Sequence, residues 1–195
     1  MVEEFYRPTI VVAKGEQYSR ASGRSINGFN IVEALRACAD ILGPHGGHPL
    51  AAGFTVETTK LEELKNRLTR LAEEQINDEQ LTPVLKIDLE VVPEDLSFSL
   101  WEQLAQFGPF GIGNPEPVFL SHNLVIVDAK TVGNGNQHLA LTVQSSVSDL
   151  KLRAIAFGMG IMLSQLSPGR KVDLVYNLIS DQWHGAKRLQ LKIKD

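Results

Sequence analysis

One segment in the first half of the chain combines residue types that bind phosphate. Residues 22–30 read Ser-Gly-Arg-Ser-Ile-Asn-Gly-Phe-Asn and precede an expected helix. The guanidinium of Arg24 is a planar fork for two phosphate oxygens. The hydroxyls of Ser22 and Ser25, with free backbone N–H groups, can complete an anion nest. The alternative is a polar loop that happens to contain an arginine.

A second segment, residues 45–53, is rich in glycine and histidine and reads His-Gly-Gly-His-Pro-Leu-Ala-Ala-Gly. We predict a tight loop at Gly46 and Gly47, whose backbone can approach a ligand closely. His48 can donate to a phosphate oxygen near neutral pH, the alternative being a core histidine bonded to backbone. His45 and His48 have the spacing of a metal pair, but no carboxylate or cysteine lies close in sequence to complete such a site.

The last expected hairpin carries an aromatic residue beside two cations. Trp183, Lys187 and Arg188 lie within residues 181–188. This combination suits base stacking and attraction to a nucleic-acid backbone. An ordinary turn, with the tryptophan packed on the end of a barrel, explains the same residues.

Composition limits the remaining chemistry. The 195 residues are 43% hydrophobic and 22% charged, which is typical of one large globular domain or two small ones. The net charge of −4 argues against a basic coat, although it allows a local basic groove. The sequence has no Asp/His cluster for two catalytic metals and no Gly-x-Ser-x-Gly nucleophile motif.

Cysteine content and hydropathy indicate the compartment. Cys38 is the only cysteine, so neither an internal disulfide nor a thiolate zinc site can form. No apolar run reaches the roughly 18 residues that span a bilayer, and the first residues are acidic where a secretory leader is basic. We therefore expect a reducing, cytoplasmic setting and no membrane partner.

Apolar patterning predicts the elements of the first half. Asn30 can cap a helix over residues 31–42, which Gly43 and Pro44 end. The other expected elements are strands at 7–13 and 54–56, an amphipathic helix over 61–76 and a polar linker over 77–83.

The second half has a different pattern, in which strand signals crowd together. The expected strands are 84–92, 119–130, 138–144, 151–157, 171–180 and 188–193, with helices at 99–107 and 158–166 and a hairpin turn at 133–136. The last five strands with one helical insert predict a small closed barrel of the oligonucleotide-binding type. The Pro- and Gly-rich stretch 109–117 lacks a surrounding β-α-β unit, so we interpret it as a structural connector.

The order of these motifs resembles the C-terminal half of the RecJ family, single-strand-specific exonucleases of the DHH phosphoesterase superfamily. The resemblance covers nearly the whole chain and rests on residues 6–11, 22–25, 28–30, 34–39, 46–48, 51–53, 109–119, 156–158 and 190–191. The Gly-Gly-His and Ala-Ala-Gly motifs are shared by DHH-associated domains, whereas the Phe-Gly-x-Gly-Asn-Pro-Glu-Pro stretch followed by a barrel is more specific to RecJ. Ala21 departs from the family, in which glycine is expected before Ser-Gly-Arg-Ser.

The resemblance implies an α+β chain: a mixed α/β DHH-associated domain at 1–77, a connecting strand and helix at 78–118, and a five-stranded OB-fold barrel at 119–195, whose first strand can start near residue 84. In the family pattern Ser22 and Arg24 match positions that hold the terminal phosphate. Gly46, Gly47 and His48 match the loop that lines the cleft near the scissile phosphate.

The resemblance also implies that catalysis and substrate binding belong to different domains. Catalysis and the Mn²⁺ or Mg²⁺ ions belong to an upstream DHH domain that is absent here, so this chain alone is expected to bind no metal and to be inactive. The intact protein is expected to be a 5′-to-3′ exonuclease of DNA repair and recombination. Its expected partners are single-stranded DNA, the DHH domain and a single-strand-binding protein.

Two other functions fit parts of the pattern. One is a DHH-family phosphodiesterase acting on short RNA or cyclic dinucleotides; such enzymes usually lack a barrel, so residues 84–195 favour the RecJ reading. The other is a catalytically dead RecJ-like scaffold in a replication complex. Metal-ligand motifs upstream of Met1 decide between enzyme and scaffold.

Overall fold

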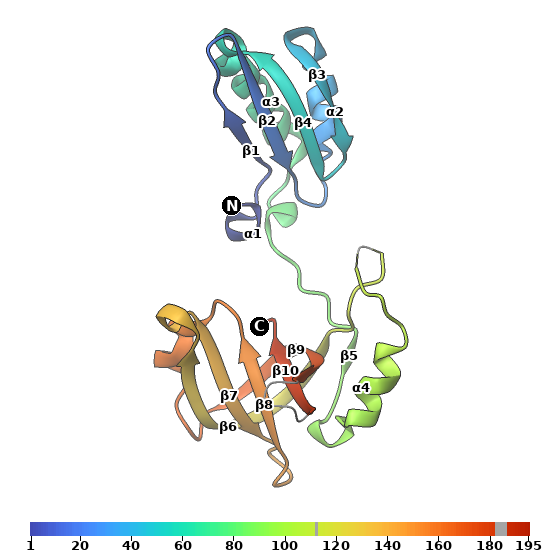
Figure 1. Ribbon diagram of the computed structural model, residues 1–195, viewed down its shortest axis with the longest axis vertical. Helices are drawn as coiled ribbons and strands as arrows, with labels where there is room; N and C mark the ends of the chain where they lie inside the picture. Colours follow the sequence, from blue (N-terminus) through green and yellow to red (C-terminus); the bar gives the residue numbers. More distant parts are fainter. Residues whose placement is uncertain (112, 182–186) are drawn as a thin grey trace. The chain divides into compact units, whose positions relative to one another are not determined.

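The computed structural model describes residues 1–111, 113–181 and 187–195 and divides into two compact units, Met1–Val84 and Leu85–Asp195 (Figure 1). The segment 78–118, expected to connect two domains, is therefore shared between them. Residues 78–84 belong to the first unit, and residues 85–118 belong to the second.

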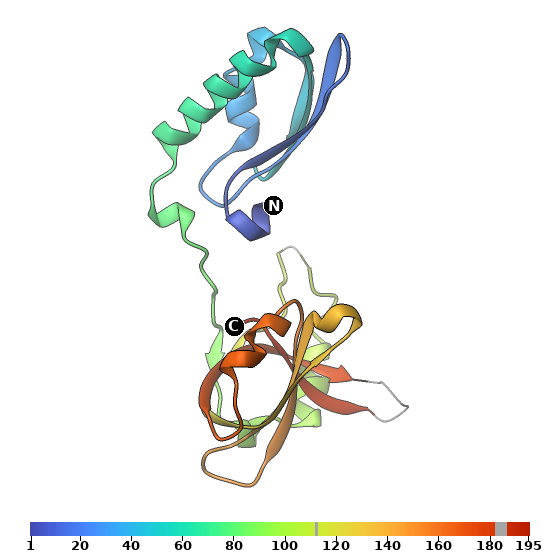
Figure 2. The same ribbon diagram turned by 90° about the vertical axis from the view of Figure 1, so that its left-hand side faces the viewer.

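The first unit is a four-stranded antiparallel sheet with the order β1-β2-β4-β3. Its strands are β1 (Thr9–Ala13), β2 (Tyr18–Arg24), β3 (Leu42–His48) and β4 (Ala51–Glu57). Helices α2 (Ile31–Arg36) and α3 (Leu61–Gln75) lie on the same face of this sheet (Figure 2). The shorter helical elements are α1 (Val2–Phe5), η1 (Ala39–Ile41), η2 (Thr58–Lys60) and η3 (Glu79–Leu81). The opposite sheet face is covered by neither α2 nor α3.

Three expectations for the first unit were wrong. The predicted polar loop at 22–30 begins inside β2, a central strand paired on both sides, because neighbouring strands override the weak strand propensity of Ser and Gly. The Gly46–Gly47 pair lies in β3 rather than in a loop, and the turn follows at residues 49–50. The helix expected over 31–42 ends at Arg36.

The apolar pattern behind that helix still predicted burial correctly. Ile31, Leu35, Cys38 and Ile41 are all buried in the core beneath the sheet. Residues 39–41 form a short 3-10 turn, which keeps the apolar side chains on the same core without continuing the α-helix. The predicted cap is confirmed, since Asn30 Oδ1 accepts hydrogen bonds from the backbone N–H groups of residues 32 and 33.

The second unit contains a closed ring of five strands. They are β6 (Phe119–Val132), β7 (His138–Gln144), β8 (Lys151–Ala156), β9 (Lys171–Asp181) and β10 (Arg188–Ile193). The order is β6-β7-β8-β10-β9, and β9 pairs again with β6, which closes the ring. The predicted OB-type barrel is therefore confirmed, including the bounds of β7 and β10. The helical insert before β9 is the 3-10 helix η6 (Gly160–Gln165).

The segment that leads into the barrel was predicted only in part. The strand expected over 84–92 is reduced to β5 (Leu89–Glu90), because the apolar alternation of 84–88 lies largely in solvent and forms no ladder. Helix α4 (Phe98–Ala105) follows, with Ser97 as its cap. The remaining short elements are η4 (Pro93–Asp95) and η5 (Asn134–Asn136). In the connector, the Asn114 side chain donates to the carbonyls of Phe107 and Pro109.

A buried tyrosine joins the barrel strands that close the ring. Tyr176 of β9 is fully buried, and its hydroxyl lies 2.7 Å from Ser121 Oγ of β6. Because Ser121 donates to the carbonyl of Val91 at 2.8 Å, the tyrosine is the donor in this pair. Burial raises the pKa of Tyr176 to about 12, so the hydroxyl keeps its proton at neutral pH.

Candidate nucleic-acid interface

Strand register places Arg24 and His48 on the same face of the first sheet. Arg24 of β2 is opposite Ala51 of β4, which is opposite His48 of β3. Directly opposite residues point to the same face, and two strand spacings separate the outer backbones by about 10 Å. Both Arg24 and His48 are exposed. The sequence did not reveal this row because its residues come from three strands.

The neighbouring row on the same face is made of small residues. Ser22 is opposite Gly53, which is opposite Gly46. A Cβ atom at Gly46 would meet nothing within 4 Å, and one at Gly53 would meet only the Ala21 carbonyl oxygen at 3.7 Å. The fold itself therefore does not require glycine at these two positions. Because Gly46 and Gly53 have no side chain, the surface beside Arg24 is flat, and a ligand can approach the backbone there. We call this flat surface at Gly46 and Gly53 the shelf.

Gly47, in contrast, is required by its close approach to the backbone of the facing strand β4. Its φ is +147°, and a Cβ atom there would lie 2.2 Å from the Ala51 carbonyl oxygen. Gly23 has a packing reason of a different kind, because a Cβ atom would lie 2.5 Å from the side chain of Ile31 in α2. Of the two adjacent glycines singled out in the sequence, Gly46 is thus the one with space for a ligand.

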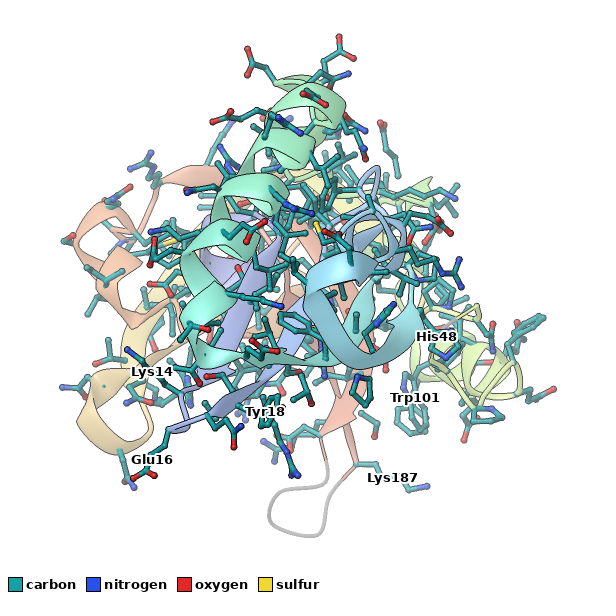
Figure 3. All side chains as sticks on the ribbon, turned by 90° about the horizontal axis from the view of Figure 1, so that it is seen from above. Lys14, Glu16, Tyr18, His48, Trp101 and Lys187 are labelled. Atoms are coloured by element: carbon teal, nitrogen blue, oxygen red, sulfur yellow. The ribbon has the colours of Figure 1, made fainter. Side chains whose placement is uncertain are left out.

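The guanidinium of Arg24 is held by its own strand. Its Nη1 atom donates to the Gly23 carbonyl oxygen at 2.9 Å and to Ser22 Oγ at 3.3 Å. Within the described residues no partner occupies its other N–H groups. No ion pair in this part of the chain involves Arg24 or Arg20, which lies on the same face of β2. Tyr18, at the start of that strand, points away from α3 in Figure 3.

The nest of free N–H groups expected at residues 22–30 does not include the backbone of residues 22–25. The backbone of β2 is paired with both of its neighbours, and the N–H of Ser25 donates to the Leu50 carbonyl at 2.9 Å. The Ser25 hydroxyl donates to the Phe29 carbonyl at 2.6 Å, so Ser25 closes the loop that leads to α2. Asn30 caps that helix. At residues 22–25 the donors available to an anion are therefore side chains on the sheet face rather than backbone N–H groups.

The second unit carries a separate group of cations. Lys187 and Arg188, expected at the hairpin tip, are exposed at the start of β10, and Lys187 is labelled in Figure 3. Trp183 lies outside the described residues.

Register adds cations that the sequence interpretation missed. Lys130 of β6, Ala140 of β7, Ile155 of β8 and Lys192 of β10 form one row across four strands. In the next row Thr142, Arg153 and Gln190 are neighbours. The outward side of each strand is visible in the sequence alternation, but the pairing that gathers these residues is not.

The described residues offer no metal centre. No group of three or more His, Cys, Asp or Glu side chains within them is arranged to hold a metal ion. The family resemblance places Mn²⁺ or Mg²⁺ in an upstream domain, and no step through a metal is derived from the described residues. In the described part of the chain, the helices are too short or too polar to span a bilayer.

Family models match both units. The DHHA1 domain matches residues 1–76, and the RecJ OB domain matches residues 87–195. The fold and the open sheet face thus define a protein that joins a DHHA1 domain to an OB-type barrel. The chain belongs to the RecJ family.

Curated relatives and solved structures agree with that assignment. The single-stranded-DNA-specific exonuclease RecJ of Bacillus subtilis is 34% identical over 197 residues, covering 100% of this chain and 25% of the relative. RecJ of Escherichia coli is 30% identical and covers 98% of this chain and 33% of the relative. A crystal structure of RecJ in complex with Mn²⁺ from Thermus thermophilus matches with a TM-score of 0.75 and 29% identity, over 100% of this chain and 27% of that one. The chain therefore spans about a quarter to a third of the length of these relatives.

Proposed function

We propose that this chain is the substrate-binding part of a single-stranded-DNA-specific 5′-to-3′ exonuclease. The observation that carries the proposal is the open sheet face, where register brings Arg24 and His48 together beside the shelf at Gly46. Ser22 orients Arg24, whose remaining N–H groups bind the terminal phosphate as a charge-assisted pair. His48 donates to a phosphate oxygen of the same strand.

The barrel has a different role in this proposal. Its outer cations attract the sugar-phosphate backbone and guide the strand, as oligonucleotide-binding barrels do. The curated relatives are named as exonucleases specific for single-stranded DNA, which supports a single strand as the substrate. A weak, salt-sensitive interaction is expected because the net charge is −4.

Cleavage belongs to a catalytic domain outside this chain. The related structures from Thermus thermophilus are described as complexes with Mn²⁺ and with Mg²⁺. We infer that such ions would be bound by the catalytic domain and would supply the chemistry of cleavage there. The residues of this chain bind, orient and guide the strand.

Two measurements on the 195-residue chain test this proposal. Binding of a labelled single strand is measured by anisotropy against salt concentration, with a duplex of the same sequence as the control. Nucleotide release is measured with Mn²⁺ or Mg²⁺ present. The proposal predicts preferential single-strand binding with a log–log salt slope of roughly −0.7 per phosphate contacted, and no release. Chelator-sensitive release of nucleotides, or equal binding of the duplex, contradicts it.

A further inference from the structure

Phe157 is an exposed aromatic residue at the end of a barrel strand. It follows β8 directly and keeps 55% of its surface exposed, whereas Phe119 and Tyr176 are buried in the barrel core. Its ring lies against His138 of β7, with 5.1 Å between the centroids and 73° between the planes. This contact orients the phenyl ring and leaves more than half of the residue open to solvent.

His138 is itself fixed by the turn that follows Phe157. The backbone N–H of Gly158 donates to His138 Nδ1 at 3.1 Å, so a neutral His138 carries its proton on Nε2. Gly158 has a φ of +77°, and a Cβ atom there would meet nothing within 4 Å. The turn therefore holds the two rings together while leaving open space beside them.

The register places these rings at one end of the cationic rows. His138 is opposite Val132 of β6, and the row of Lys130 and Lys192 begins two residues further along the strands, at a distance of about 7 Å. Arg153 lies in the row beyond.

These cations are available to a ligand. No ion pair or side-chain hydrogen bond within the described residues engages Lys130, Arg153 or Lys192. One carboxylate shares the surface: Asp128 is opposite Thr142, which is opposite Arg153. The surface from Phe157 to Arg153 thus combines an open aromatic ring with three cations and an acid.

We propose that Phe157 is a base-stacking site at the end of a basic track formed by Lys130, Lys192 and Arg153. The inference rests on the proposed function of the barrel as a guide for single-stranded DNA and deepens it. An unpaired base stacks on the phenyl ring, and the three cations attract the phosphates of the neighbouring nucleotides. A duplex has no free base face to offer, so the ring favours a single strand.

The row of Lys130 and Lys192, which lies nearest the ring, offers little for recognition of a particular base. Ala140 and Ile155 occupy the middle of the first row and carry no side-chain group that can hydrogen-bond a base edge. Stacking is tolerant of base identity because every base has a π face. Stacking on Phe157 therefore accepts any base, as an enzyme that removes nucleotides in succession requires.

The test compares strands with and without bases in the intact 195-residue chain. Phe157→Leu removes the aromatic face but keeps an apolar side chain, and Phe157→Trp retains stacking. Affinity is measured by anisotropy for an oligothymidine and for an abasic strand of the same length. Phe157→Leu is expected to weaken oligothymidine binding about 5- to 100-fold, to leave abasic binding unchanged, and to be rescued by Phe157→Trp. Circular dichroism checks that the variants fold.

Charge variants separate failure of this inference from failure of the proposed function. Lys130→Ala and Lys192→Ala are expected to weaken both strands and to reduce the salt slope by roughly 0.7 each, whereas Lys171→Ala on β9 is the matched control. Loss with the charge variants but none with Phe157→Leu overturns stacking and leaves the guiding role intact. An equal loss on the oligothymidine and the abasic strand with Phe157→Leu also overturns stacking, because the abasic strand has no base to stack. No single-strand binding by the wild-type chain overturns the proposed function itself.

Discussion

In the first unit the guanidinium of Arg24 is held by its own strand, whereas Lys130, Lys192 and Arg153 on the barrel have no side-chain hydrogen-bond partner within the described residues. On its β4 side Arg24 has only small neighbours, Ala51 and Gly53, so a ligand can come close to it from there. The barrel instead spreads its three cations over several strands. A fixed fork suits recognition of one terminal group, while separated flexible cations suit a backbone that passes through many positions.

The cations on helix α3, for which we propose no role in DNA binding, differ from these because they form ion pairs with neighbouring carboxylates. Arg67 pairs with Asp40 at 2.8 Å and with Glu63 at 2.6 Å, and Lys65 and Arg70 each have a glutamate one helical turn away. These exposed pairs neutralise the helix locally and contribute little stability each. The unpaired Arg20 and Arg24 are on the opposite side of the same unit, which is consistent with an anionic partner for the open sheet face.

The two adjacent glycines give the largest expected effect within the first unit. Gly47→Ala places a Cβ atom against the Ala51 backbone at positive φ and is expected to cost about 2–4 kcal/mol of unfolding free energy. Gly46→Ala is the matched control and is expected to change stability by less than about 0.5 kcal/mol, because its Cβ atom meets nothing. Urea unfolding of both variants checks this. Equal destabilisation shows that the shelf at Gly46 is structural.

The buried tyrosine tests whether the barrel is a fixed support for its outer face. Tyr176→Phe removes the donor to Ser121 and is expected to lower the free energy of unfolding by about 1 kcal/mol. Tyr18→Phe, at a tyrosine that is 55% exposed, is the control and is expected to be neutral. Thermal unfolding followed by circular dichroism measures both. A neutral Tyr176→Phe variant contradicts the bond's role in closing β9 onto β6.

The smallest expected effect is a pH dependence at the start of the barrel. His122 Nδ1 lies 2.9 Å from Asp173 Oδ2, and this hydrogen bond raises the pKa of His122. The hydrogen bond from the backbone N–H of Asn123 lowers the pKa of Asp173, and the hydrogen bond with His122 lowers it further. Because the pKa of His122 is raised in the folded protein, its contribution to stability is fully present below the pKa of the unfolded state. This contribution is lost as the pH rises through the pKa of the folded state. Because the pKa of Asp173 is lowered in the folded protein, its contribution to stability is fully present above the pKa of the unfolded state. This contribution is lost as the pH falls through the pKa of the folded state.

The pair therefore stabilises the barrel in the mildly acidic range between the two folded pKa values. His122→Asn is expected to lower the melting temperature slightly in that range and to have no effect well above neutral pH. Both side chains are about half exposed, so solvent screening keeps the effect small. A difference that grows with rising pH contradicts this assignment.

The sequence predicted elements with regular alternation better than elements made of small residues. The bounds of β7 and β10 followed from apolar and polar residues in strict alternation. Strand β2 was missed because Ser, Gly and Ala carry little strand signal, and its two partners decide its conformation. The separate roles of Gly46 and Gly47 also depend on the distances to Ala51 and its neighbours, which no local pattern encodes.

The candidate site was predictable as a set of residues but not as a surface. Arg24 and His48 were identified by chemical type, whereas their common face follows from pairing across β4. Lys130 and Lys192 are neighbours only through a register that spans four strands, so a single sequence gives no signal for it.

The central claim is that Arg24 binds the terminal phosphate. Its most direct test uses this chain joined to the catalytic domain that the proposed function requires. Cleavage of single strands with a 5′-phosphate or a 5′-hydroxyl is compared in wild type, Arg24→Ala and the matched control Arg20→Ala, on the same face of β2. We predict that Arg24→Ala loses roughly 10- to 100-fold in kcat/KM on the phosphorylated strand, as expected for a charge-assisted hydrogen bond, and little on the other, while Arg20→Ala keeps the preference. An equal loss on both strands with Arg24→Ala contradicts the claim.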